Sequence, residues 1–359
     1  MVDSIRIRAT TTESNLELKK WKIVVNQKTG EYHYRARIKS IRLSFYPDSK
    51  NVIISGRYIS TYTKSKFKNY DEVFETKGQI FEFFYNLENH INSYFVIPVV
   101  DILNDKVTRI DYCTNLSTKN VKEYIEFFNR YYNTNPKKLT SYTNHAVKQG
   151  LPIDSSCYIK TSKQYEEQKN QNFTLNMYWK SDELENKRRK QISKFGKSSI
   201  TDEDIIEAEN ILRVEVQLHY AKLKAVCKKF KINPKTCCLY DLFNIEIASY
   251  VLKNELKRFF TDSDFYSYEK AKEVIQLKIK NHKSKKAALE YIKAVAKNNK
   301  VDSTAIPKKL IDIGIFPYYF IPRDWNIDFL PSAIKLIDEK IQTNQLQWLS
   351  LKKGGNTYD

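Results

Sequence analysis

Apolar and polar residues alternate between Ile211 and Leu218. Because successive side chains of a β-strand point to opposite faces, the apolar residues at 212, 214, 216 and 218 would share one face. Arg213, Glu215 and Gln217 would share the other face. A core strand carries such side chains only where that face lines water, a partner or a site, so the pattern predicts a strand with a functional polar face.

Two tyrosine-containing stretches upstream show the same alternation. Residues 156–163 would place Tyr158 and Lys160 on one face of a strand, and residues 173–180 would place Tyr178 and Lys180 together. These strands would add phenolic hydroxyls and cations to the polar face.

Residues 107–113 form a further predicted strand, in which Arg109 and Asp111 repeat the Arg-x-acid pattern of Arg213 and Glu215. Two such strands about a hundred residues apart suggest neighbouring positions in one sheet. The alternative is a pair of unrelated surface strands whose charges form ordinary ion pairs.

The remaining pattern predicts hairpins at 21–38 and 41–55, each with a turn between alternating stretches. Helical spacing predicts helices over 78–91 and 119–132, and the charged stretch 181–210 reads as a helical or loop excursion between strands. After Pro234 the pattern becomes helical, with helices expected at 239–260, 266–280, 284–298, 306–313 and 331–349.

These elements predict an α+β fold: an antiparallel β-sheet catalytic domain with flanking helices, followed by a mostly helical C-terminal region. The expected divisions are a loose N-terminal lead-in over 1–18, an α+β domain over 19–232 and a helical domain over 233–359.

The charge balance narrows the class of partner. Sixty-one Lys and Arg against 42 Asp and Glu give a net charge of +19, and the chain has 25 Tyr. Such a composition favours a polyanionic partner, and nucleic acid more than a membrane surface. The alternative is that the composition only reflects an AT-rich genome, whose codons favour Lys, Asn, Ile and Tyr. The sequence has no CxxC pair, phosphate-binding glycine loop or apolar run of about 18 residues, so we expect a cytoplasmic protein without a membrane partner.

The polar strands carry the parts needed to cut a DNA strand and rejoin it. A tyrosine nucleophile can keep the phosphate, because a phenoxide leaves more readily than a sugar alkoxide. Carboxylates at Asp111 and Glu215 could hold a divalent metal, Mg²⁺ or Mn²⁺. The phosphate oxygens would be held by Arg109, Lys160, Lys180 and Arg213. Packing and ion pairing are the alternative roles for all of these residues.

The lysines near the start of the 284–298 helix could serve a different purpose. With the 266–280 helix it would make a helix-turn-helix unit, with Lys285 and Lys286 near DNA phosphates. An ordinary helical pair with solvated lysines is the alternative.

The order of these motifs resembles the phage and plasmid replication initiators of the gene II/X type. Those proteins carry a tyrosine-containing strand, a Tyr-x-Lys-x-x-Glu strand end and a Leu-Arg-x-Glu-x-Gln strand, matched here at 158–163, 178–183 and 212–217. The stretches 108–111, 51–56 and 313–331 also fit, so the resemblance spans about 40–335.

The resemblance implies initiation of rolling-circle replication: a nick at an origin, a 5′-phosphotyrosyl link and later closure of the strand. Tyr158 is the favoured nucleophile and Tyr178 its rival. The implied partners are double-stranded origin DNA, single-stranded DNA and a host helicase, and a homodimer stays open. Rolling-circle nickases often hold their metal with a His-hydrophobic-His triplet, which this sequence lacks, so the metal is assigned to the acids.

Two other functions remain open. One is a non-catalytic protein that binds an origin or operator. The other is a mobilisation relaxase, which performs the same chemistry during DNA transfer.

Overall fold

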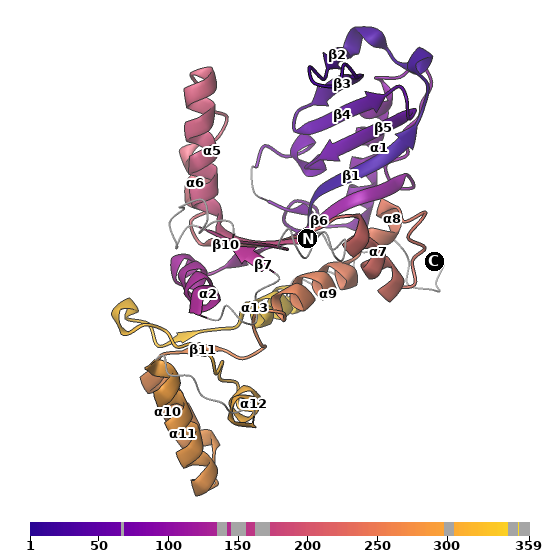
Figure 1. Ribbon diagram of the computed structural model, residues 1–359. Helices are drawn as coiled ribbons and strands as arrows, with labels where there is room; N and C mark the ends of the chain where they lie inside the picture. Colours follow the sequence, from indigo (N-terminus) through magenta and orange to yellow (C-terminus); the bar gives the residue numbers. More distant parts are fainter. Residues whose placement is uncertain are drawn as a thin grey trace.

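The computed structural model describes residues 1–65, 68–134, 142–144, 156–161, 173–297, 305–343 and 351. These residues form an antiparallel ten-stranded sheet with helices around it, so the predicted α+β class is confirmed (Figure 1). The strands, in their order across the sheet, are β2 (Lys22–Val25), β3 (Tyr32–Ile38), β4 (Ile41–Tyr46), β5 (Asn51–Gly56), β1 (Val2–Thr10), β6 (Lys106–Ser117), β10 (Ile211–Leu218), β9 (Phe173–Trp179), β8 (Ser156–Thr161) and β7 (Tyr142–Asn144).

Both predicted hairpins are confirmed, as β2 pairs with β3 and β4 pairs with β5. Helix α1 (Lys77–Asn92) begins at a Thr76 capping box, and α2 (Val121–Thr134) follows β6. The charged excursion is a pair of helices, α5 (Lys180–Phe195) and α6 (Asp202–Glu207), which rise from the sheet between β9 and β10 (Figure 1).

The N-terminal residues correct the expectation of a loose lead-in. Residues 2–10 form β1, which lies between β5 and β6 in the middle of the sheet. Ile5, Ile7 and Ala9 are buried, while Arg6 and Arg8 are exposed. This period-two pattern is short and interrupted by Asp3 and Ser4, which is why the stretch reads as polar when taken alone.

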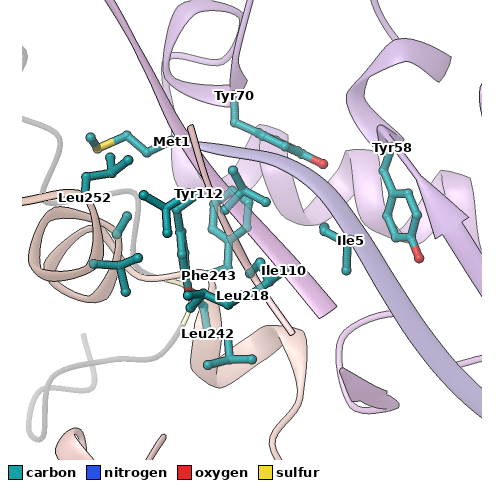
Figure 2. Packing of buried hydrophobic residues seen from close by; sticks show 14 of the residues in the cluster. Met1, Ile5, Tyr58, Tyr70, Ile110, Tyr112, Leu218, Leu242, Phe243 and Leu252 are labelled. Atoms are coloured by element: carbon teal, nitrogen blue, oxygen red, sulfur yellow. The ribbon is translucent and has the colours of Figure 1, made fainter. Parts of the chain in front are cut away.

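The apolar face of the central strands packs against helices from both ends of the chain. Tyr70 contacts the rings of Phe84 on α1 and Phe243, with centroids 5.8 and 5.0 Å away. The Tyr112 hydroxyl on β6 donates a 2.7 Å hydrogen bond to the Leu242 carbonyl. Figure 2 shows Tyr70, Tyr112, Leu242 and Phe243 in one buried cluster with Ile5 and Leu252.

The helices after β10 are α7 (Tyr220–Lys229), α8 (Leu239–Leu242), α9 (Ile245–Leu256), α10 (Tyr268–Lys278), α11 (His282–Ala296), α12 (Ala305–Asp312) and α13 (Ala333–Thr343). Helices α7 and α9 contact β6 and β10, and α13 contacts β6, so residues on both sides of position 232 share the main core. Helices α10, α11 and α12 enclose a separate small core. Two short strands, Phe265–Tyr266 and Phe329–Leu330, pair within this largely helical region. Within the described ranges, no helix has the length and apolar content needed to cross a bilayer.

Candidate active site

The polar face of the central sheet brings the sequence-predicted residues into rows across the strands. Directly opposed residues point to the same face. The register places Cys113, Glu215, Asn176 and Tyr158 in one row, Asp111, Gln217, Thr174 and Lys160 in the next, and Asn115, Arg213, Tyr178 and Ser156 on the other side of the first. The predicted nucleophile and the two predicted metal ligands therefore share one face.

The register also sets the spacing of these groups. Asp111 on β6 lies diagonally across from Glu215 on β10, because Asp111 is opposite Gln217, and such diagonal neighbours are roughly 7–8 Å apart. Tyr158 lies on β8, two strands from Glu215 with β9 between them, which corresponds to roughly 10 Å between backbones.

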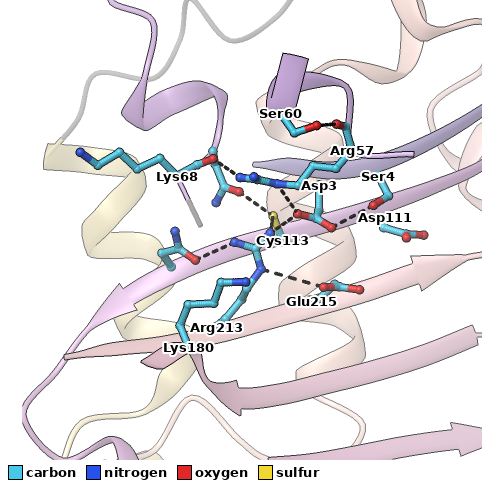
Figure 3. A network of polar contacts seen from close by, with 12 residues as sticks. Asp3, Ser4, Arg57, Ser60, Lys68, Asp111, Cys113, Lys180, Arg213 and Glu215 are labelled. Atoms are coloured by element: carbon cyan, nitrogen blue, oxygen red, sulfur yellow. Dashed lines mark hydrogen bonds and ion pairs between the residues drawn. The ribbon is translucent and has the colours of Figure 1, made fainter. Parts of the chain in front are cut away.

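Arg213 lies at the centre of this face and is fully buried. Its guanidinium donates to Asn115 Oδ1 at 2.9 Å, to Cys113 Sγ at 3.2 Å and to the Asp3 carboxylate, and it lies 3.9 Å from Glu215 (Figure 3). A buried arginine stays protonated, so these acids act as its counter-ions. The sequence predicts that Arg213 holds phosphate, and this stays a prediction. Its guanidinium is already bonded to these protein groups, which would compete with phosphate.

Asp3 is a residue of the polar face that the sequence analysis did not identify. Val2 pairs with Tyr112 and Ser4 pairs with Asp111, so Asp3 is the extra residue of a β-bulge. Its carboxylate accepts from Arg213 and, at 3.1 Å, from Arg57. Burial opposes the charge on Asp3, but the two arginines prevail and lower its pKa below the ordinary value.

The carboxyl group of Asp111 has a raised pKa, in contrast to that of Asp3. Burial raises its pKa to about 7, although Arg109 donates two hydrogen bonds to it, from Nε at 2.8 Å and Nη2 at 2.5 Å. The charges of Glu215 and Asp3 raise this pKa further. Asp111 is thus poised to gain or lose a proton near neutral pH.

Glu215 responds in the same way. Burial, followed by the charge of Asp3, raises the pKa of its carboxyl group. It accepts a 2.9 Å hydrogen bond from Gln217 and a 3.3 Å hydrogen bond from the Tyr178 hydroxyl. Crowding of carboxylates on neighbouring strands makes this part of the face attractive to a cation.

The donor set fits a magnesium-type ion. Among the described residues no group of three or more His, Cys, Asp or Glu has the arrangement of a metal site. Mg²⁺, however, is commonly held by one or two carboxylates, with water and substrate phosphates completing its shell. Asn176 Oδ1, in the row between Glu215 and Tyr158, is buried and has no hydrogen-bond partner within the described structure. This amide oxygen is a third hard donor beside the acids.

The two candidate tyrosines have different surroundings. Burial raises the pKa of Tyr178 well above its ordinary value, and its hydroxyl is bonded to Glu215. Tyr178 is therefore better suited to orienting Glu215 than to attacking phosphorus. Tyr158 is half-buried on β8, towards the edge of the sheet.

The predicted cations are distributed over two regions. Lys180 begins α5, is 4% exposed and donates a 2.9 Å hydrogen bond to Glu183, and burial lowers its pKa to about 8. Lys160 belongs to β8 by its backbone, but its side chain lies outside the described part. Lys285 and Lys286 are on α11, which packs with α10 and not on the sheet (Figure 1).

The raised pKa of Asp111 predicts a pH dependence of stability. Between the unfolded pKa of 3.8 and the folded pKa of about 7, the folded chain binds more protons, so stability falls as pH rises. The slope from one such group is up to about 1.4 kcal/mol per pH unit. Urea unfolding from pH 4.5 to 7.5 with EDTA should show this slope together with that of the other raised carboxyl groups, such as Glu215, and Asp111→Asn should remove the share due to Asp111. Equal slopes in both proteins would contradict the assignment.

Compared with known proteins, the chain matches no family model and no curated protein sequence.

Proposed function

We propose that the protein nicks one DNA strand through a tyrosine nucleophile and so starts rolling-circle replication of a phage or plasmid. The observation that carries the proposal is that Tyr158, Asp111 and Glu215 share one polar sheet face, beside Arg109 and Lys180. The order of motifs that resembles the gene II/X initiators supports the same chemistry.

In this proposal the Tyr158 oxygen attacks a backbone phosphorus. A bond forms between that oxygen and phosphorus, the bond from phosphorus to the 3′ oxygen breaks, and the phenolic proton is lost while the 3′ oxygen gains one. Because the 5′-phosphotyrosyl link retains the bond energy, the 3′ hydroxyl can later attack it and close the strand.

The surrounding residues would hold charge in place during this exchange. Arg109 would hold phosphate oxygens by a planar pair of N–H groups if it turned from Asp111 towards the substrate. Tyr178 and Gln217 keep the Glu215 carboxylate oriented. A divalent ion held by Asp111, Glu215 and Asn176 would neutralise the phosphate when bound.

A non-catalytic DNA-binding protein is the second candidate. The two hydrogen bonds from Arg109 to Asp111 and the contacts of Arg213 with Asp3 favour it, because they are what purely structural ion pairs would make. A relaxase would share the first mechanism and differ only in the DNA that it serves.

Covalent capture of DNA separates these functions. The protein should be incubated with a supercoiled plasmid that carries the DNA flanking its own coding region, with Mg²⁺ or Mn²⁺. We expect relaxed circles and a protein–DNA adduct that survives denaturant, and EDTA should abolish both. Binding without any adduct in either metal would favour the non-catalytic protein.

A further inference from the structure

A row of arginines crosses the outer face of the N-terminal half of the sheet. Arg37 on β3 lies opposite Arg42 on β4, and Arg42 lies opposite Ser55 on β5. Ser55 lies opposite Arg6 on β1, and Arg6 lies opposite Arg109 on β6. Four arginines and one serine thus face the same side of five adjacent strands, and we call them the arginine row.

The arginine row is open to solvent and largely without acidic partners. Arg6, Arg37 and Arg42 are exposed, and none of them has an ion pair within 4.0 Å to a described carboxylate. Only Arg109 pairs with an acid, Asp111. The opposite face of the same strands is apolar and buried. Structural packing therefore does not explain the guanidinium groups.

These arginines line a pocket of about 250 Å³ together with serine hydroxyls. The lining includes Arg6, Arg37, Arg42, Arg109, Ser40 and Ser55. The Gly56 backbone forms part of the wall, where a Cβ atom would lie only 2.6 Å from the Ser40 carbonyl oxygen. Guanidinium and hydroxyl donors around one hollow are the groups that bind phosphate oxygens.

The charge arrangement favours an extended anion over a single phosphate. Like charges directly opposite each other on neighbouring strands destabilise a sheet, so Arg37 and Arg42 repel until an anion lies between them. A second row alongside adds further cations, namely Lys22, Arg35, Arg8 and Lys106. Four interstrand gaps of ~4.8 Å make the arginine row about 19 Å long. A row of that length spans more than one phosphate of a nucleic-acid backbone.

Two aromatic rings on the same face favour a single strand. His33 and Tyr46 follow the period-two positions of Arg37 and Arg42, and their rings stack with centroids 5.2 Å apart. Tyr46 is 42% exposed, so its ring can receive an unpaired base. At the other end, Arg109 adjoins Asp111 and the face that carries Tyr158.

We infer that the arginine row binds the phosphate backbone of single-stranded DNA and guides it to the polar face of the sheet. The choice of DNA rests on the proposed function, whereas the anion site rests on the arginine row alone. The bound strand would run across β3, β4, β5 and β1 and reach β6 at Arg109.

The test is salt-dependent binding by Arg37→Ser/Arg42→Ser. Fluorescence anisotropy with a labelled 30-nucleotide single strand, in a Tyr158→Phe background that prevents covalent capture, gives Kd from 50 to 300 mM salt. Losing two phosphate contacts should reduce the slope of log K against log salt by about 1.4 and weaken binding roughly tenfold or more. The Tm should stay equal or rise, because a like-charge pair has been removed.

The matched control is Lys308→Ser/Arg323→Ser, which removes the same charge from exposed positions beside the separate C-terminal core. It should leave the slope nearly unchanged. Equal losses in both variants, or an unchanged slope in Arg37→Ser/Arg42→Ser, would overturn the inference. The same measurement with a duplex of the same sequence tests the preference for single strands. If Arg37→Ser/Arg42→Ser weakened binding to the duplex alone, the assignment to single strands would be wrong.

The outcomes also separate this inference from the proposed function. In one outcome, the protein with Tyr158 intact forms no adduct, but Arg37→Ser/Arg42→Ser still weakens DNA binding. That result would contradict the nickase proposal and support the arginine row as a binding site. In the other outcome, the adduct forms, but Arg37→Ser/Arg42→Ser binds DNA as tightly as the unchanged protein. That result would support the nickase proposal and contradict the arginine row as a binding site.

Discussion

Replacing Arg213 with methionine should lower the free energy of unfolding by about 3–5 kcal/mol. The guanidinium is 1% exposed and is the shared partner of Asp3, Asn115 and Cys113. Methionine has a similar length but leaves the Asp3 carboxylate with Arg57 as its remaining ion-pair partner among the described residues. The loss arises because the half-buried Asp3 carboxylate keeps only one of its two arginine counter-ions, not from the area that methionine buries. Urea denaturation followed by circular dichroism measures it.

A double-mutant cycle tests that reason. Asp3→Asn should destabilise the wild-type protein more than it destabilises Arg213→Met, because the carboxylate has already lost a partner there. Arg189→Met, at a guanidinium that is 72% exposed, is the matched control and should change stability by no more than about 0.5 kcal/mol. If Arg213→Met behaved like this control, the buried network would not be an important source of stability.

The alternation of residue types was sufficient to predict the strands of the polar face. Because side chains on a strand repeat every two residues, Arg213, Glu215 and Gln217 had to share a face once 211–218 formed a strand. The same rule placed Arg109 with Asp111. The neighbourhood of β6 and β10, inferred from the repeated Arg-x-acid pattern, is confirmed by their direct pairing.

The pairings between distant residues could not be derived from the same rule. Asp3 reaches Arg213 because β1 enters the middle of the sheet and a β-bulge turns Asp3 towards the polar face. Neither the strand order nor a bulge leaves a local sequence signal. The arginine row was missed for a similar reason, since its members come from strands that become adjacent only in the fold.

Binding of one ion by both Asp111 and Glu215 stays a prediction, because the two residues lie on adjacent strands but in different rows. Their adjacent rows, and the rise that the Glu215 charge causes in the pKa of Asp111, place them in one neighbourhood. The alternative of simple ion pairing also has support, because Arg109 takes both oxygens of Asp111. Nicking would therefore require the substrate phosphate to replace Asp111 as the hydrogen-bond partner of Arg109. The DNA nicking assay tests this directly.

Replacing Tyr158 with phenylalanine should abolish the covalent DNA adduct, with nicking reduced by roughly 10³-fold or more, since the nucleophilic oxygen is gone. Stability should change little, because the half-buried ring is retained. Denaturing gel electrophoresis of labelled DNA after incubation with Mn²⁺ detects the adduct. Single-stranded DNA binding should persist, since its charge contacts do not involve the phenol.

Tyr178→Phe separates the nucleophile from a residue that positions Glu215. It removes the hydroxyl that donates to Glu215 but leaves the favoured nucleophile, Tyr158, in place, so we expect slower nicking with the adduct still formed and a shifted pH profile. Tyr85→Phe, at an exposed ring on α1, is the matched control and should nick normally. An adduct that survives Tyr158→Phe but disappears in Tyr178→Phe would transfer the nucleophile to β9. An adduct that survives both changes would show that the nucleophile is not on the polar face. In the described strands, no other tyrosine occupies the three central rows of that face.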